Sequence, residues 1–297
     1  MGPESRLRVP GTPLGLRAIV LLSIAVSGLG AVWFLGLDPA GLVPSEGGLV
    51  VAKAFFAHAF SPALRSEGQF DAAILPVTLE SAWMTVVFAA AAISISLVFG
   101  LIGGFLGSTA WWAGNPGVGA RESGSGMLGR VRRIVGPVIY AWIRILIALL
   151  RSVHELLWAV IFLAAFGLNH LTAVIAISIP YTGTFAKIFS EIIDETPRDA
   201  SEALRDLGAS PLQVFFYGLI PRALPDLGAY AFYRFECALR SSAVLGFFGL
   251  PTLGREIKLS FQSSHYGETW THLYALLFLV VVFDVWSGAL RRRVLHD

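Results

Sequence analysis

Three charged residues lie within an otherwise apolar run near the C-terminal end of the chain. They are Arg234, Glu236 and Arg240, and Ser241 follows them directly. Charges in an apolar, membrane-like setting are costly unless they are paired or hydrated, and they commonly mark a pathway. Glu236 and Arg240 are four residues apart, so they share one helix face and can form an ion pair. Arg234 has no acidic residue three or four positions away, so it needs a partner elsewhere.

Two interpretations of these residues stay open. In the structural interpretation, Glu236 and Arg240 form a buried ion pair and Arg234 extends toward the polar surface. In the functional interpretation, Arg234 or Arg240 lines a translocation pathway for an anion, together with Glu236 and Ser241. A guanidinium forms paired hydrogen bonds with a phosphate or phosphonate group, which would be the chemistry of such a pathway.

A second group of residues lies just before this run, where the sequence predicts a short amphipathic helix over 198–207. Pro197 and Asp199 are typical of a first helical turn, and Gly208 is typical of a helix end. We expect Glu202 on the polar side, and Ala203 and Leu207 on the apolar side.

A further short amphipathic piece is expected to follow Ser210 and to end at Pro221 and Pro225. On physical grounds alone, the helix over 198–207 is either a solvated loop helix or an element that docks into a groove of a partner.

The composition shows what kind of molecule holds these residues. Of the 297 residues, 55% are hydrophobic and only 14% are charged, whereas soluble domains carry about 25% charged residues. A soluble globule and a disordered chain are therefore excluded, and the single cysteine, Cys237, excludes a disulfide framework within the chain. Long unbroken apolar runs argue against an outer-membrane barrel. The remaining class is an all-α integral membrane protein.

Six transmembrane helices are predicted from runs of about 20 apolar residues. Their ranges are 18–37, 81–107, 152–168, 170–193, 223–247 and 269–290. A cleavable signal peptide is the alternative for the first range, although no small-residue cleavage site follows it.

The range 134–193 allows two or three crossings, and the basic residues decide between them. If 134–150 lies along the membrane interface, the basic N-terminus, the arginines of 121–151 and the Arg291–Arg293 triplet share one side. The positive-inside rule favours that arrangement, with both termini cytoplasmic. Arg144 also suits an interfacial helix better than a bilayer centre.

The segment 202–221 resembles the Glu-Ala-Ala signature of the permeases of binding-protein-dependent ABC importers. The matching residues are Glu202, Ala203, Gly208 and Pro221. The departures are Leu204, Gly218 and Ile220, which replace alanine, isoleucine and leucine respectively. In that family this helix is the coupling helix, and it docks into a cleft of a cytoplasmic ATPase.

The resemblance extends over 78–292, beginning at Thr78-Leu79-Glu80. The stretches 149–168 and 229–249 resemble the phosphonate-importer permeases in particular. His154 stands where many relatives have proline, at the position of a local bend. The resemblance implies a five-helix type I importer core, here with one additional N-terminal helix, that works as a dimer of permease subunits.

The implied organisation has three parts. Residues 1–77 hold the N-terminal tail, the first transmembrane helix and an extracytoplasmic segment, residues 78–292 form the permease domain, and residues 293–297 form a cytoplasmic tail. The implied location is the bacterial inner membrane. The implied partners are an ATPase dimer, an extracytoplasmic substrate-binding protein and a second permease subunit, either a copy or a paralogue. The implied substrate is phosphonate, phosphate or phosphite.

The chain itself is not expected to be an enzyme. It has no phosphate-binding GxxxxGK[ST] motif, so ATP and Mg²⁺ are expected on the partner ATPase, with no cofactor or metal in this chain. The alternative function is an ion-gradient-driven carrier of a small anion, which would need acidic sites deep in the helices; only Glu236 qualifies. A membrane enzyme would need clustered His, Asp or Ser residues, which the sequence lacks.

Overall fold

A computed structural model describes residues 15–36, 41, 44–66, 73–109, 127–210 and 213–294. The expectations for residues 1–14 and 295–297, and for Pro211, lie outside the described residues. All regular elements within the described ranges are helices, in agreement with the all-α prediction. The chain divides into two compact units, Met1–Ala57 and His58–Asp297, and each is described by itself.

The first unit contains helices α1 (Leu16–Phe34) and α2 (Glu46–Ala57). Helix α1 has no charged residue after Arg17, but it is shorter than the other candidate spans, so the predicted first span stays a prediction. Its apolar part, Ala18–Phe34, is 17 residues long, which corresponds to about 25 Å. Helix α2 lies in the segment that the sequence predicts to be extracytoplasmic.

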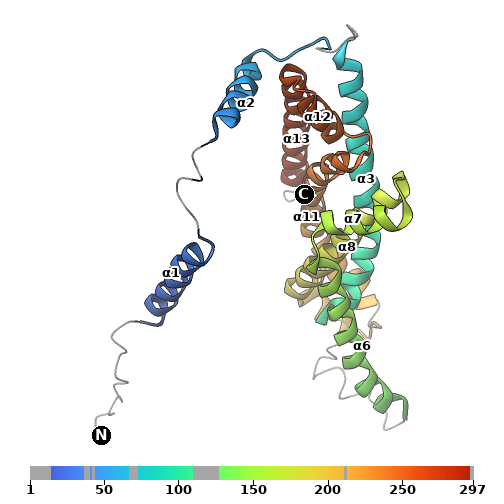
Figure 1. The fold of residues 1–297 in the computed structure, drawn as a ribbon. Coiled ribbons are helices and arrows are strands. Elements are labelled where there is room, and N and C mark those ends of the chain that lie inside the picture. Colours follow the sequence, from blue (N-terminus) through green and yellow to red (C-terminus); the bar gives the residue numbers. More distant parts are fainter. Residues whose placement is uncertain are drawn as a thin grey trace. The chain divides into compact units, whose positions relative to one another are not determined.

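In its described residues the second unit has five long helices and several short ones, arranged as in Figure 1. The long helices are α3 (Ile74–Gly107), α6 (Met127–Ser152), α8 (His170–Glu195), α11 (Ile220–Val244) and α13 (Tyr266–Val294); α11 begins directly after a π-helix. The short elements are η2 (His58–Phe60), α7 (Glu155–Phe166), α9 (Asp199–Asp206), the π-helix η3 (Val214–Leu219), η4 (Leu245–Phe248) and α12 (Leu253–Gln262).

Within the described residues, α3, α8 and α13 are each long and apolar enough to span a membrane. Helices α6 and α7 pass that test only together, and they are bent by 86° at the break between Ser152 and Glu155. Helix α11 has the length of a span, but it carries five charged residues.

The expected separate span at 152–168 is therefore wrong. Helix α7 has only 12 residues and rises about 18 Å, less than the ~30 Å hydrocarbon core. The bend expected near His154 is present, and the histidine replaces proline by capping α7: its Nδ1 accepts a hydrogen bond from the Leu156 amide at 3.3 Å. The C-terminal half of α6 packs against α8, where Ile147 is buried.

The sequence analysis predicted that the helical piece after Ser210 ends at Pro221 and Pro225. This prediction is wrong. Helix α11 continues directly from the π-helix η3, with Pro221 in its first turn and Pro225 inside it. A proline is tolerated in a first turn because its missing N–H has no intrahelical partner there. The predicted span over 223–247 is thus the C-terminal part of a longer helical segment that begins with η3.

Small residues allow α3 and α8 to pack closely. A side chain at Gly103 would come within 2.7 Å of Ala186, and one at Gly104 within 2.7 Å of Phe189. Two serine hydroxyls lie across this contact: the Ser96 Oγ atom is 3.0 Å from the Ser178 carbonyl and the Ser178 Oγ atom is 3.3 Å from the Ala92 carbonyl, while shorter bonds run within each helix, to Ala92 at 2.7 Å and to Val174 at 2.6 Å. Between helices in lipid, such packing and hydrogen bonds replace the hydrophobic driving force.

The contact between α6 and α8 depends on Gly183. A Cβ atom there would lie 2.7 Å from the Leu150 Cβ atom and 3.0 Å from the Arg151 backbone nitrogen. Replacing Gly183 with alanine should therefore separate α6 from α8 and cost about 1–3 kcal/mol of stability. The midpoint of thermal unfolding of the solubilised chain measures this change.

Gly288→Ala is the matched control, because this helical glycine has no atom within 4 Å of the added methyl group. The control should keep the wild-type midpoint or exceed it, since alanine favours a helix. Equal midpoints for the two variants would contradict the close contact at Gly183.

Candidate functional site

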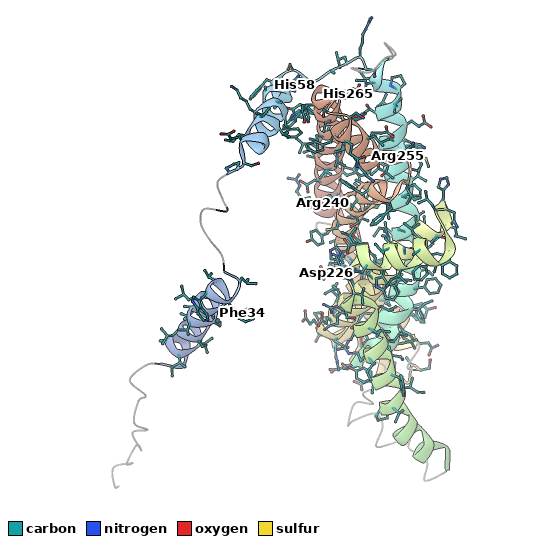
Figure 2. The ribbon with its side chains drawn as sticks, viewed as in Figure 1. Phe34, His58, Asp226, Arg240, Arg255 and His265 are labelled. Carbon is teal, nitrogen blue, oxygen red and sulfur yellow. The ribbon has the colours of Figure 1, made fainter. Side chains whose placement is uncertain are left out.

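The four residues predicted to line a pathway all lie on α11, and the structure shows where each one bonds. Glu236 and Arg240 form the expected ion pair at 2.8 Å. The Glu236 side chain is 14% exposed and the Arg240 side chain is 57% exposed, so the carboxylate is the buried member. Both Asp226 and Arg240 lie on α11, Asp226 near its start and Arg240 near its end, and Figure 2 labels both residues.

Arg234 finds its partners in aromatic rings instead of a carboxylate. Its guanidinium lies 4.8 Å from the ring centroid of Tyr181 on α8 and 6.0 Å from that of Tyr230 on its own helix. A cation over an aromatic face is stabilised by the ring quadrupole. Its Nε atom is buried without a hydrogen-bond partner among the described residues. The charge therefore stays within the helical unit and keeps hydrogen-bonding capacity.

A chain of hydrogen bonds links the same tyrosine to the break between α6 and α7. Ser241 donates to the Glu155 Oε1 atom at 2.8 Å, and its oxygen lies 3.0 Å from the Tyr181 hydroxyl. A serine hydroxyl has one proton to donate. Because Ser241 uses that proton on Glu155, the Tyr181 hydroxyl is the donor to Ser241. Helices α7, α8 and α11 thus share one polar cluster: Arg234, Tyr181, Ser241 and Glu155.

Two members of this cluster were missed by the sequence analysis. Tyr181 lies 53 positions before Arg234, so no helical spacing relates them. Glu155 falls inside the predicted span 152–168, but no partner for its carboxylate could be inferred from spacing along the chain. Its position directly after the break, at the start of α7, was the available signal.

The short helix predicted over 198–207 is α9, Asp199–Asp206. Gly208 follows it with a φ of +84°, as expected for a glycine that ends a helix. Glu202, Ala203 and Leu207 are all exposed, Leu207 to 85%. The expected apolar side, Ala203 and Leu207, is therefore left uncovered in this chain.

The opposite side of α9 packs on the π-helix η3. Ser201 is buried and Leu204 half-buried against Gly218. A Cβ atom at Gly218 would lie 3.0 Å from the Ser201 Oγ atom and 3.2 Å from the Leu204 Cδ1 atom. Leu204 thus occupies the space that a side chain at 218 would need. Arg222 of α11 adds an exposed ion pair to Asp199 at 3.6 Å.

The end of the second unit that holds the start of α13 carries another polar group. Glu268 accepts hydrogen bonds from Ser66 at 3.0 Å and Ser260 at 3.2 Å, and His265 lies 3.6 Å from it. Figure 2 shows Arg255 and His265 toward this end.

Burial raises the pKa of Glu256 on α12, and the charge of Glu80 adds to that effect, while Arg255 opposes it.

Solved structures of ABC transporters share this fold. A chain of an amino acid ABC transporter is 18% identical, with a TM-score of 0.58 over 74% of this chain and 94% of that chain. An inward-facing MetNI methionine ABC transporter gives 20% identity and a TM-score of 0.56 over 74% of this chain and 97% of that chain. At such identities the likeness concerns the fold alone.

Curated relatives are transport permeases. The phosphite transport system permease protein PtxC of Stutzerimonas stutzeri is 35% identical over 156 residues, which are 52% of this chain and 57% of the relative. The phosphate-import permease protein PhnE of Mycolicibacterium smegmatis is 28% identical over 54% of this chain and 30% of the relative. A putative cryptic phosphonate transport system permease protein, PhnE2 of Escherichia coli, is 29% identical over 40% of this chain and 97% of the relative.

The chain spans little more than half the length of the first of these relatives. A family profile covers more of it. The profile described as "Binding-protein-dependent transport system inner membrane component" matches residues 125–296, a range that contains α6 to α13 with both the polar cluster and α9. The chain therefore belongs to the family of inner membrane components of binding-protein-dependent transport systems.

Proposed function

We propose that this chain is the permease subunit of an ATP-driven importer for a phosphorus oxyanion: phosphonate, phosphite or phosphate. The observation that carries the proposal is the guanidinium of Arg234, which lies over the ring of Tyr181 within the helical unit. The Tyr181 hydroxyl in turn hydrogen-bonds to Ser241, and Ser241 hydrogen-bonds to Glu155. A fixed guanidinium matches a tetrahedral oxyanion. The similar permeases are named for phosphite, phosphate and phosphonate transport, which supports the same substrate class.

The proposed topology has six crossings, with α6 and α7 together as one broken span. The crossings are α1, α3, α6–α7, α8, α11 and α13. The number is the one predicted from sequence, and so is the parity, which leaves both termini in the cytoplasm. The basic residues of 121–133 and Arg291–Arg293 then lie on the cytoplasmic side, as the positive-inside rule favours. The range 134–150, predicted to be interfacial, is part of the third crossing in this proposal.

Helix α9 acts as the coupling helix in this proposal. Its exposed residues, Glu202, Ala203 and Leu207, offer a surface to a cytoplasmic ATPase, while Ser201 and Leu204 fasten it to η3. Because η3 continues into α11, a movement of α9 reaches the helix that carries Arg234, Glu236 and Arg240. Gly208 follows the end of α9, and Pro221 lies in the first turn of α11, so these two residues flank the segment between α9 and α11.

Transport then follows from alternating access. A loaded extracytoplasmic binding protein docks on the segments 38–80 and 248–268, and ATP, bound with Mg²⁺ by the partner ATPase dimer, drives closure of that dimer. The motion opens the pathway first outward and then inward. Binding along the pathway must be weak, because a tightly held anion would not be released. The permease domain, 78–292, pairs with a second permease subunit and supplies no catalytic residue.

Reconstitution tests this function directly. The chain should co-purify with its ATPase, and a receptor loaded with methylphosphonate, phosphite or phosphate should stimulate ATP hydrolysis and uptake into proteoliposomes. The empty receptor is the control. Uptake by the chain alone, driven by an ion gradient without any ATPase, would overturn the proposal in favour of a secondary carrier.

Arg234→Gln should reduce oxyanion uptake about tenfold or more, since one charge-assisted hydrogen bond contributes about 1.5–3 kcal/mol. Arg240 needs a paired change, because Arg240→Gln alone leaves the buried Glu236 without its ion-pair partner. The variant Glu236→Gln/Arg240→Gln keeps the charge balanced. Arg292→Gln, an exposed arginine near the end of α13, is the control and should retain uptake. Undiminished uptake by an assembled Arg234→Gln complex would rule out its role.

Leu204 and Gly218, the residues that replace alanine and isoleucine of the Glu-Ala-Ala signature, should compensate for one another. Gly218→Ile places a side chain against Ser201 and Leu204, so we expect substrate-stimulated ATPase activity to fall about fivefold, which corresponds to about 1 kcal/mol. Adding Leu204→Ala frees the space and should restore most of the activity. Gly228→Ile is the matched control, since no atom lies within 4 Å of a Cβ atom at Gly228. A double variant no better than Gly218→Ile would contradict this account.

A further inference from the structure

A cavity of about 260 Å³ lies between α6 and α8, apart from the polar cluster around Arg234. Arg144, Arg151 and Lys187 line it, together with Ile147, Ala148 and Ser152. A water molecule takes up about 30 Å³ of liquid volume, so the cavity has room for a small anion.

Geometry brings these three cations together. Arg144 and Arg151 are seven residues apart, two helical turns along one face of α6, and Lys187 stands on the facing helix α8. Gly183 allows the two helices to touch one turn before Lys187, with the Arg151 backbone 3.0 Å from where its Cβ would be. The charges therefore converge from both walls.

The cavity has more positive than negative charge. Lys187 is paired with Glu191, one turn farther along α8. Arg144 donates a hydrogen bond to the neutral Ser190 hydroxyl at 2.9 Å and lies 5.7 Å from the Tyr140 ring centroid. Neither Arg144 nor Arg151 has an ion pair within the part of the chain that the structure describes. Unpaired cations close to one another are stabilised by an anion between them.

The cavity and the polar cluster share two chain segments. Tyr181, whose ring contacts Arg234, lies six residues before Lys187 on α8. Arg151 lies next to the break that leads from α6 to Glu155 of the cluster. The remaining cations, Arg144 and Lys187, lie farther along α6 and α8 in the direction of the predicted cytoplasmic side.

We propose that the α6–α8 cavity is a second anion site, in which Arg151 and Arg144 bind a tetrahedral phosphorus oxyanion with Lys187 opposite. The inference rests on the proposed function for the identity of the free anion. The same chemistry fits the headgroup phosphate of an anionic phospholipid, so the experiment has an arm for each source.

The first arm measures binding without transport. The purified full-length chain, in nanodiscs of phosphatidylcholine, is titrated with methylphosphonate and with phosphite, and line broadening is followed by phosphorus NMR. Arg144→Gln/Arg151→Gln should weaken binding about tenfold or more. Arg151→Lys, which keeps the charge but loses the planar fork, should give an intermediate value. Arg292→Gln should bind like the wild type.

The second arm repeats the titration in nanodiscs that contain phosphatidylglycerol, and mass spectrometry counts the lipid retained by the purified chain. Suppression of the broadening by phosphatidylglycerol, together with loss of retained phosphatidylglycerol in Arg144→Gln/Arg151→Gln, would support the site and identify a lipid phosphate as its occupant. If methylphosphonate binding persists with phosphatidylglycerol, the occupant is the free oxyanion. The proposal is overturned if Arg144→Gln/Arg151→Gln keeps the wild-type thermal unfolding midpoint and binds both the oxyanion and phosphatidylglycerol as the wild type does.

These measurements separate the second site from the proposed function. Binding needs no ATPase and no receptor, so an anion site that depends on Arg151 can exist even if reconstituted complexes fail to import phosphonate. Conversely, import that is intact in Arg144→Gln/Arg151→Gln together with unchanged binding would remove the second site and leave the importer in place.

Discussion

Close approach of α8 to its two neighbours is the contact on which the second unit depends. Lipid is as apolar as a leucine side chain, so helices in a membrane gain little from burying hydrophobic surface against each other. Glycines at 103 and 104 on α3 and at 183 on α8 remove the side chains that would keep the backbones apart. The buried aromatic residues Phe185 and Phe189 then fill the space around these glycines.

The same approach creates the polar interior. Because α8 is held against both α3 and α6, its Tyr181 reaches Arg234 and Ser241 on α11 while its Lys187 faces Arg144 and Arg151 on α6. An ionised group within a hydrophobic unit is tolerated only with such partners. The close packing of α8 against α3 and α6 and the two groups of cationic residues near α8 are thus consequences of one helix position.

Local features of the chain were predictable because their partners lie within one or two helical turns. The Glu236–Arg240 ion pair follows from a four-residue spacing, and the end of α9 follows from the conformational freedom of Gly208, whose φ is positive. The prolines at 221 and 225 misled the prediction, since a first-turn proline starts a helix as readily as it ends one. The span at 152–168 failed because α7, which begins after the bend near His154, has only 12 residues.

Composition, apolar runs and the distribution of arginines were sufficient to determine the class of the protein, and short-range spacing was sufficient for α9 and the charged face of α11. Only the tertiary structure decided which residues share a site. Tyr181 and Arg234 are 53 positions apart, and Leu204 and Gly218 fit together only because η3 brings them into contact. Helical periodicity relates residues along one helix, whereas the close packing of α3, α6, α8 and α11 relates residues of different helices.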